Sequence, residues 1–90
     1  MSRILKEVVI INELGLHARA AAMISKIAQT ASSTVWISKA EKTVDASSIL
    51  DILTLGCEKD ARIILEIDDP SDMDVLNNIG QMVECGFGEE

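Results

Sequence analysis

The hydrophobic pattern of the chain changes its period between Ile11 and Ala20, and this change limits the folds open to it. Residues 8–11 form an unbroken apolar run, and we expect a strand over residues 6–11. From Ala20 onward, apolar residues recur at spacings of three and four, which predicts a helix over residues 18–31. A strand followed closely by an amphipathic helix predicts a domain of mixed α and β structure.

The only histidine of the chain, His17, falls at this junction, at or beside the start of the predicted helix. The first turn of a helix carries backbone N–H groups without intrahelical partners and a partial positive charge, which together favour a phosphoryl group. The same field disfavours a protonated imidazole, so His17 could act as a nucleophile. The guanidinium of Arg19 can form paired hydrogen bonds with phosphate oxygens. His17 and Arg19 are therefore the candidate catalytic residues, and Ala18 and Arg19 the candidate phosphate-binding residues.

An ordinary structural role is the alternative for both side chains. A single histidine in a small domain is commonly a plain surface or core residue. An arginine on a helix is more often solvated than bound to an anion. No second histidine and no thiol or acidic cluster accompanies His17, so we expect no metal site there.

The remaining segments alternate between strand and helix patterns. Strands are expected over residues 34–39, 43–46 and 61–67, and helices over residues 47–55 and from Asp69 to the glycines near the C-terminus. The order β-α-β-β-α-β-α predicts an α+β open-faced sandwich, a four-stranded antiparallel sheet with three helices on one face. Ninety residues suit one domain, residues 1–90.

Three finer expectations follow from local patterns. The continuous apolar run before His17 favours a strand buried on both faces, or one in a central position of the sheet. Ser25 should face water on the polar side of its helix. Glu89 and Glu90 should fray beyond the last helix.

Charge and cysteine usage restrict the partners and the compartment. The net charge of −7 disfavours nucleic acid and anionic membrane surfaces, and no apolar run approaches the ~20 residues of a membrane span. The first seven residues lack the apolar segment of a signal peptide. Cys57 and Cys85 lie far apart without metal-ligand spacing. We therefore expect a cytoplasmic protein with reduced thiols.

Two segments resemble one known family. Residues 15–19 (Gly-Leu-His-Ala-Arg) are similar to the active-site signature of HPr, the histidine-containing phosphocarrier family of the bacterial phosphoenolpyruvate-dependent sugar phosphotransferase system. Residues 48–56 (SILDILTLG), about thirty positions further on, are similar to that family's regulatory-serine segment. The resemblance covers roughly residues 6–83.

The resemblance implies a function and a set of partners. His17 would accept phosphate, on Nδ1 in this family, from an enzyme I-like donor that uses phosphoenolpyruvate, and pass it to a IIA-like sugar permease subunit. The chain would then be a stoichiometric phosphoryl carrier rather than a turnover enzyme, without a cofactor, and by default a monomer. Ile49 and Leu50, together with Ala20, match positions of partner docking. In some members a serine kinase phosphorylates the position of Ser48, where capping of a helix is the simpler role.

The sequence departs from the family pattern at several positions. Ala20 stands where proline is usual, and proline is pre-organised for the first turn of a helix. Lysines that are frequent around the family's site are replaced by Gln29, Ser47 and Asp51. Because partner enzymes generally present acidic docking surfaces, Asp51 either weakens binding or implies a co-adapted partner.

Two other functions remain open. The chain could be a regulatory protein-binding module of the HPr family, in nitrogen control or catabolite repression, that acts through its phosphorylation state and the helix at Ser48. It could also be a plain structural domain, although both motif matches would then be coincidental.

Overall fold

Strands and helices alternate along the chain in the predicted order. The computed structural model describes residues 3–89, and Glu90, which we expected to fray, lies outside them. The main elements are β1 (Ile4–Val9), α1 (Ala18–Ala28), β2 (Val35–Lys39), β3 (Lys42–Asp45), α2 (Ile49–Leu53), β4 (Arg62–Ile67) and α3 (Met73–Glu84). Short 3-10 turns, Pro70–Asp72 and Gly86–Gly88, stand on either side of α3.

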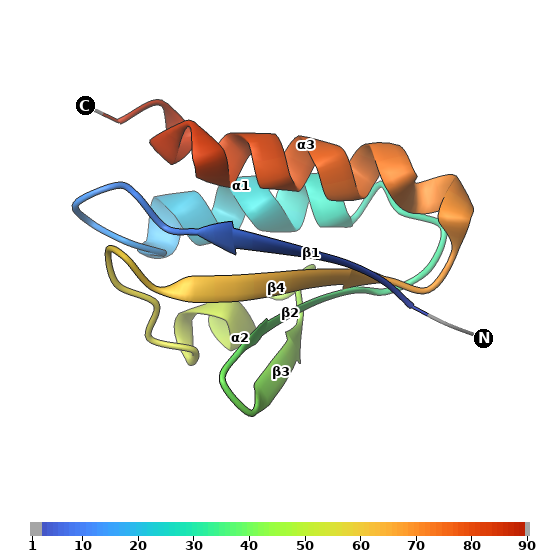
Figure 1. Cartoon of the computed structure of the whole chain (residues 1–90), viewed down its shortest axis with the longest axis horizontal. Helices are drawn as coiled ribbons and strands as arrows, with labels where there is room; N and C mark the ends of the chain where they lie inside the picture. Colours follow the sequence, from blue (N-terminus) through green and yellow to red (C-terminus); the bar gives the residue numbers. More distant parts are fainter. Residues whose placement is uncertain (1–2, 90) are drawn as a thin grey trace.

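The four strands form one antiparallel sheet in the order β1-β4-β2-β3. The long helices α1 and α3 lie side by side over one face of this sheet, and α2 lies near β2 and β3 (Figure 1). The element order, the single four-stranded antiparallel sheet and the three helices confirm the predicted fold class, an α+β open-faced sandwich.

The expected central position of the first strand is wrong, because β1 is an edge strand that pairs only with β4. Along β1 the side chains alternate, with Leu5 and Glu7 exposed and Val8 buried. The strand ends at Val9, so the apolar run continues into the loop, where Ile10 is buried and Ile11 is exposed. The run therefore reflects a strand end and a buried loop residue, rather than a strand covered on both faces.

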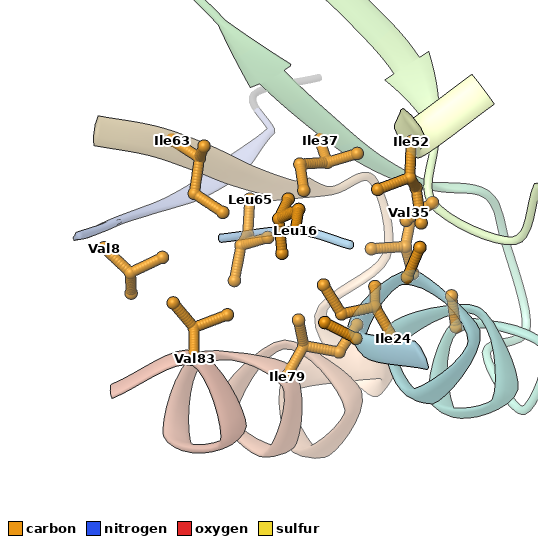
Figure 2. Close-up of a cluster of buried hydrophobic side chains, with 14 of the residues drawn as sticks. Val8, Leu16, Ile24, Val35, Ile37, Ile52, Ile63, Leu65, Ile79 and Val83 are labelled. Atoms are coloured by element: carbon orange, nitrogen blue, oxygen red, sulfur yellow. The ribbon is translucent and has the colours of Figure 1, made fainter. Parts of the chain in front are cut away.

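Aliphatic side chains fill the space between the sheet and the helices. Figure 2 shows Ile63, Leu65 and Ile37 of the sheet facing Ile79 and Val83 of α3. Burying a side chain of this kind contributes roughly 1.5–3 kcal/mol relative to leaving it exposed. Because both layers contribute such residues, the core holds α1 and α3 on the sheet and so determines where the start of α1 lies.

The first helix ends at Ala28, three residues earlier than predicted. After it, the amides of Thr30 and Ala31 bond back to Ile27 and Ala28, which is the tighter spacing of a 3-10 turn. Ser25, expected on the polar side, is buried, since its hydroxyl donates to the carbonyl of Ser47 at 2.6 Å. Ser25, which the helical pattern places on the solvent side of α1, therefore contacts the segment that precedes α2.

The last helix starts through a capped turn. Asp69 is the cap of the Pro70–Asp72 turn and accepts from the amide of Ser71, as the Asp-Pro pair predicts. Asp72 is buried and its carboxylate accepts from the amides of Ser32 and Ser33. This carboxylate ties the loop after α1 to the beginning of α3.

Candidate functional site

His17 is the N-cap residue of α1, the position that the sequence predicts. Its carbonyl accepts the first helical hydrogen bond, from the amide of Ala21 at 2.9 Å. Within residues 3–89, the amides of Ala18, Arg19 and Ala20 have no hydrogen-bond acceptor. Unpaired amides at the positive end of a helix dipole form a site that accepts an anion.

A short loop fixes the backbone that enters this helix. The amide of Gly15 donates to the carbonyl of Asn12 at 3.1 Å, and the next amide, of Leu16, donates to the carbonyl of Cys57 at 2.9 Å. Gly15 has a φ of 65°, and a Cβ at that position would lie 2.4 Å from the Cys57 carbonyl oxygen. Only glycine fits there, so Gly15 determines the path of the chain into His17.

The imidazole of His17 contacts the carboxylate of Glu89. Nε2 lies 2.5 Å from Oε2 of Glu89, and the same oxygen accepts from the guanidinium of Arg19 at 2.7 Å. The other oxygen, Oε1, accepts from the side-chain amide of Asn12 at 2.9 Å. His17 and Arg19, the two predicted catalytic residues, are thus brought together on one carboxylate.

These hydrogen bonds hold Glu89 in its ionised form. The pKa of Glu89 is lowered, first by the hydrogen bond from Asn12 and then by the one from His17, while burial acts in the opposite direction and the charge of Arg19 adds a smaller lowering. An ionised carboxylate can only accept hydrogen bonds. The ring proton between the two side chains therefore belongs to Nε2 of His17.

A cleft of about 290 Å³ lies beside these residues. Arg19, Asn12 and Glu89 contribute to its wall, together with exposed Leu14. The carboxylate of Glu89 forms hydrogen bonds with side chains and none with the amides at the start of α1, among the residues described. The anion-binding end of the helix is therefore still available.

Of the three predicted docking residues, two are exposed. Leu50 has 75% and Ile49 39% of its surface accessible, both on α2, which packs beside α1. Exposed aliphatic side chains next to a candidate site suit contact with a protein partner. The third, Ala20, is 0% exposed and its methyl group packs into the core, so its side chain offers no accessible surface to a partner.

Ser48 is the N-cap residue of α2. Its hydroxyl accepts from the amide of Asp51 at 3.2 Å, so it has the capping role that its sequence position allows. The helix it caps has five residues, shorter than the predicted span 47–55. Ser48 is half-buried, and the acidic residues Asp45 and Asp51 lie three positions before and after it in the chain.

A membrane-spanning helix and a metal site are both absent from the part of the chain that the structure describes. No helix among residues 3–89 is long and apolar enough to cross a membrane. In the same range, no three His, Cys, Asp or Glu side chains are grouped as a metal ion requires. Cys57 is buried and Cys85 exposed, both as free thiols, and burial raises the pKa of the Cys57 thiol.

Comparison with known proteins assigns the family. A family model described as "PTS HPr component phosphorylation site" matches residues 4–84. The chain belongs to the HPr family. Among its relatives, the phosphocarrier protein HPr of Cupriavidus necator is 33% identical over 84 residues, which cover 93% of this chain and 94% of that protein. The phosphocarrier protein HPr of Neisseria meningitidis serogroup A is 34% identical, over 89% of this chain and 90% of that protein.

Solved structures agree with this HPr assignment. The crystal structure of HPr-C-His from Thermoanaerobacter tengcongensis has a TM-score of 0.88 and 32% identity, and covers 100% of this chain and 99% of that one. A phosphocarrier protein HPr from Bacillus anthracis has a TM-score of 0.85 and 26% identity, over 92% of this chain and 99% of that one. Both the sequence and the backbone therefore follow the HPr pattern along nearly the whole chain.

Sequence reasoning missed the contribution of Glu89 and Asn12 to the site of this HPr family member. Glu89 was expected to fray, but its side chain is only 13% exposed and binds His17. Glu89 and His17 are 72 positions apart, so no local sequence pattern predicts that they are in contact. The one available signal is the glycine pair around Phe87, which allows the chain to reverse direction after α3.

Proposed function

We propose that the chain is a phosphoryl carrier that accepts phosphate on His17 and passes it to a second protein. The observation that carries this proposal is the set of three unpaired amides, of Ala18, Arg19 and Ala20, directly after the imidazole. Arg19 lies on the same turn and adds a permanent positive charge. Membership of the HPr family supports the same activity.

The transfer step forms one bond to phosphorus and breaks another. The lone pair of Nδ1 of His17 attacks the phosphorus atom of a phosphorylated donor, and the donor's bond to phosphorus breaks as the N–P bond forms. Nδ1 has no proton to lose when the ring proton is on Nε2. The amides of Ala18 and Arg19 and the guanidinium of Arg19 hold the phosphoryl oxygens, so positioning and electrostatic stabilisation supply the catalysis.

The openness of the site suits a carrier, because the phosphoryl group has to leave again. Arg19 has 61% of its side chain exposed, and the free amides stand at one end of a helix. A site that bound the phosphoryl group on all sides would also stabilise the phosphohistidine, which is the starting state of the next transfer. That transfer would then be slower. A few donors on one side position the group without retaining it.

The donor and the acceptor both have to reach the same imidazole. We propose a phosphoenolpyruvate-dependent enzyme I-like donor and a sugar permease subunit of the IIA type as acceptor, both acting on a cytoplasmic monomer. Leu50 and Ile49 of α2 offer these partners an apolar surface beside the site. Asp51, exposed between them and the end of α2, favours a partner with fewer acidic residues at its docking surface.

The second candidate is regulation through α2, and the exposure of Leu50 favours it as well. In this function the same apolar surface binds a regulatory protein, and the phosphorylation state controls the binding. A phosphate on Ser48 would meet the start of α2 but would also face the carboxylate of Asp51. The start of α2 would stabilise a phosphate on Ser48 and the carboxylate of Asp51 would destabilise it, so phosphorylation of Ser48 stays a prediction.

The decisive experiment is incubation of the purified chain with phosphoenolpyruvate and an enzyme I-like donor, followed by mass measurement. The wild-type chain should gain one phosphoryl group that acid removes, because phosphohistidine is acid-labile. His17→Ala should gain none, while Lys26→Ala, a change on the exposed side of α1, should behave like the wild type. An acid-labile phosphate on His17→Ala would show that another residue carries the group.

A further inference from the structure

The segment after α3 reverses direction and returns to the candidate site. Gly86, Phe87 and Gly88 have φ values of 65°, 59° and 75°, a left-handed run that turns the chain sharply. Phe87 is buried in the core, and a non-glycine residue adopts such a φ only when its surroundings hold it there. This anchored turn delivers the side chain of Glu89 to the start of α1.

Glu89 then makes three hydrogen bonds with groups that belong to two other segments. Asn12 donates to Oε1, while His17 and Arg19 donate to Oε2. Asn12 is itself buried and its side-chain amide also donates to the carbonyl of Gly15 at 2.9 Å. The carboxylate is therefore held from both sides, by the loop before α1 and by its first turn.

We propose that Glu89 is a positioning residue for His17, which fixes the imidazole in the Nε2–H tautomer and presents Nδ1 as the nucleophile. A carboxylate accepts hydrogen bonds only, so it selects the tautomer with its proton on Nε2. In the Ser-His-Asp triad a carboxylate likewise holds one ring nitrogen of the histidine and leaves the other free to react, although there the nitrogen that is held is Nδ1. The effect of Glu89 on phosphoryl transfer rests on the function proposed above, whereas its effect on the ring does not.

A competing role is blockage, in which Glu89 occupies the place of the phosphoryl oxygens. The contacts favour positioning, because Glu89 binds Nε2 and leaves the amides of Ala18 and Arg19 without a partner among the described residues. Arg19 uses one guanidinium nitrogen for Glu89 and has further N–H groups for phosphate. The carboxylate thus binds the ring through Nε2 and forms no hydrogen bond with the free amides among the described residues.

The test combines nuclear magnetic resonance with kinetics on three proteins. His17 is the only histidine, so the ¹⁵N shifts of its ring report the tautomer without ambiguity. The proteins are the wild type, Glu89→Ala, and the control Glu84→Ala, which removes an exposed carboxylate at the end of α3 with the same change in net charge. Circular dichroism checks that each variant is folded.

We expect the wild type and Glu84→Ala to show the Nε2–H tautomer, and Glu89→Ala to show a mixture of both tautomers. With an enzyme I-like donor, Glu89→Ala should lower kcat for phosphoryl acceptance roughly tenfold, as loss of a group that orients a histidine does elsewhere. KM should stay unchanged, because α2 is not altered.

Two results would overturn the proposal. One is a folded Glu89→Ala whose ring ¹⁵N shifts equal those of the wild type. The other is a faster phosphoryl acceptance by Glu89→Ala, which would make Glu89 a competitor of phosphate. If the tautomer changes as expected but the wild type takes no phosphate from the donor, the positioning role stands and the proposed function fails.

Discussion

At the scale of single residues, Gly15 decides where His17 lies. Its φ of 65° disfavours any residue with a Cβ, and an added Cβ would lie 2.4 Å from a backbone oxygen that cannot move freely. Gly56 has a similar φ of 61°, but a Cβ added there would have no atom within 4 Å. A substitution at Gly56 therefore measures the cost of backbone strain without a close contact. We predict that Gly56→Ala lowers the free energy of unfolding by about 1 kcal/mol and Gly15→Ala by about 3 kcal/mol. Urea denaturation measures both, and equal losses would contradict the role of the close contact.

At the scale of elements, α2 depends on its cap more than a longer helix would. It has five residues, and the hydroxyl of Ser48 satisfies the amide of Asp51 in its first turn. We predict that Ser48→Ala lowers the free energy of unfolding by about 1 kcal/mol. Ser33→Ala is the matched control, because that hydroxyl makes no hydrogen bond among the described residues, and it should change stability by less than about 0.5 kcal/mol. A Ser48→Ala variant as stable as this control in urea would show that the cap contributes nothing.

At the scale of the whole molecule, carboxylates that accept hydrogen bonds in the folded chain make the fold sensitive to acid. The pKa of Asp72 is lowered, chiefly by the hydrogen bond from the backbone of Ser32. A carboxyl group whose pKa is lower in the folded chain stabilises the fold above its ordinary pKa, and this stabilisation is lost as pH falls through the lower value. We predict that Asp72→Asn is less stable than the wild type at pH 7 and loses less stability between about pH 5 and pH 2.

Thermal unfolding across this pH range measures the acid dependence of both proteins. Glu13 and Glu89 also have lowered pKa values, so the variant should keep part of the slope. Identical slopes for the wild type and Asp72→Asn would mean that Asp72 has the same pKa in the folded and unfolded chains.

Much of the fold could be predicted because its signals are local. The change of hydrophobic period around His17 located the junction of strand and helix, and the Asp69–Pro70 pair located the start of the last helix. The predictions that were wrong concern residues whose burial or position depends on a segment far away in the chain. Ser25 is buried beside Ser47, whose carbonyl accepts a hydrogen bond from its hydroxyl, and β1 lies at the edge of the sheet, beside β4, which is far from it in the chain.

By itself, the sequence determined the order of the elements, the aliphatic core and the place of His17 at the start of α1. These depend on side-chain periodicity and on turn residues, which act between neighbours in the chain. Only the tertiary structure decided the order of the strands and the contact of Glu89 with His17. That contact joins residues 72 positions apart, and it exists because the packing of Phe87 in the core holds the chain reversal in place.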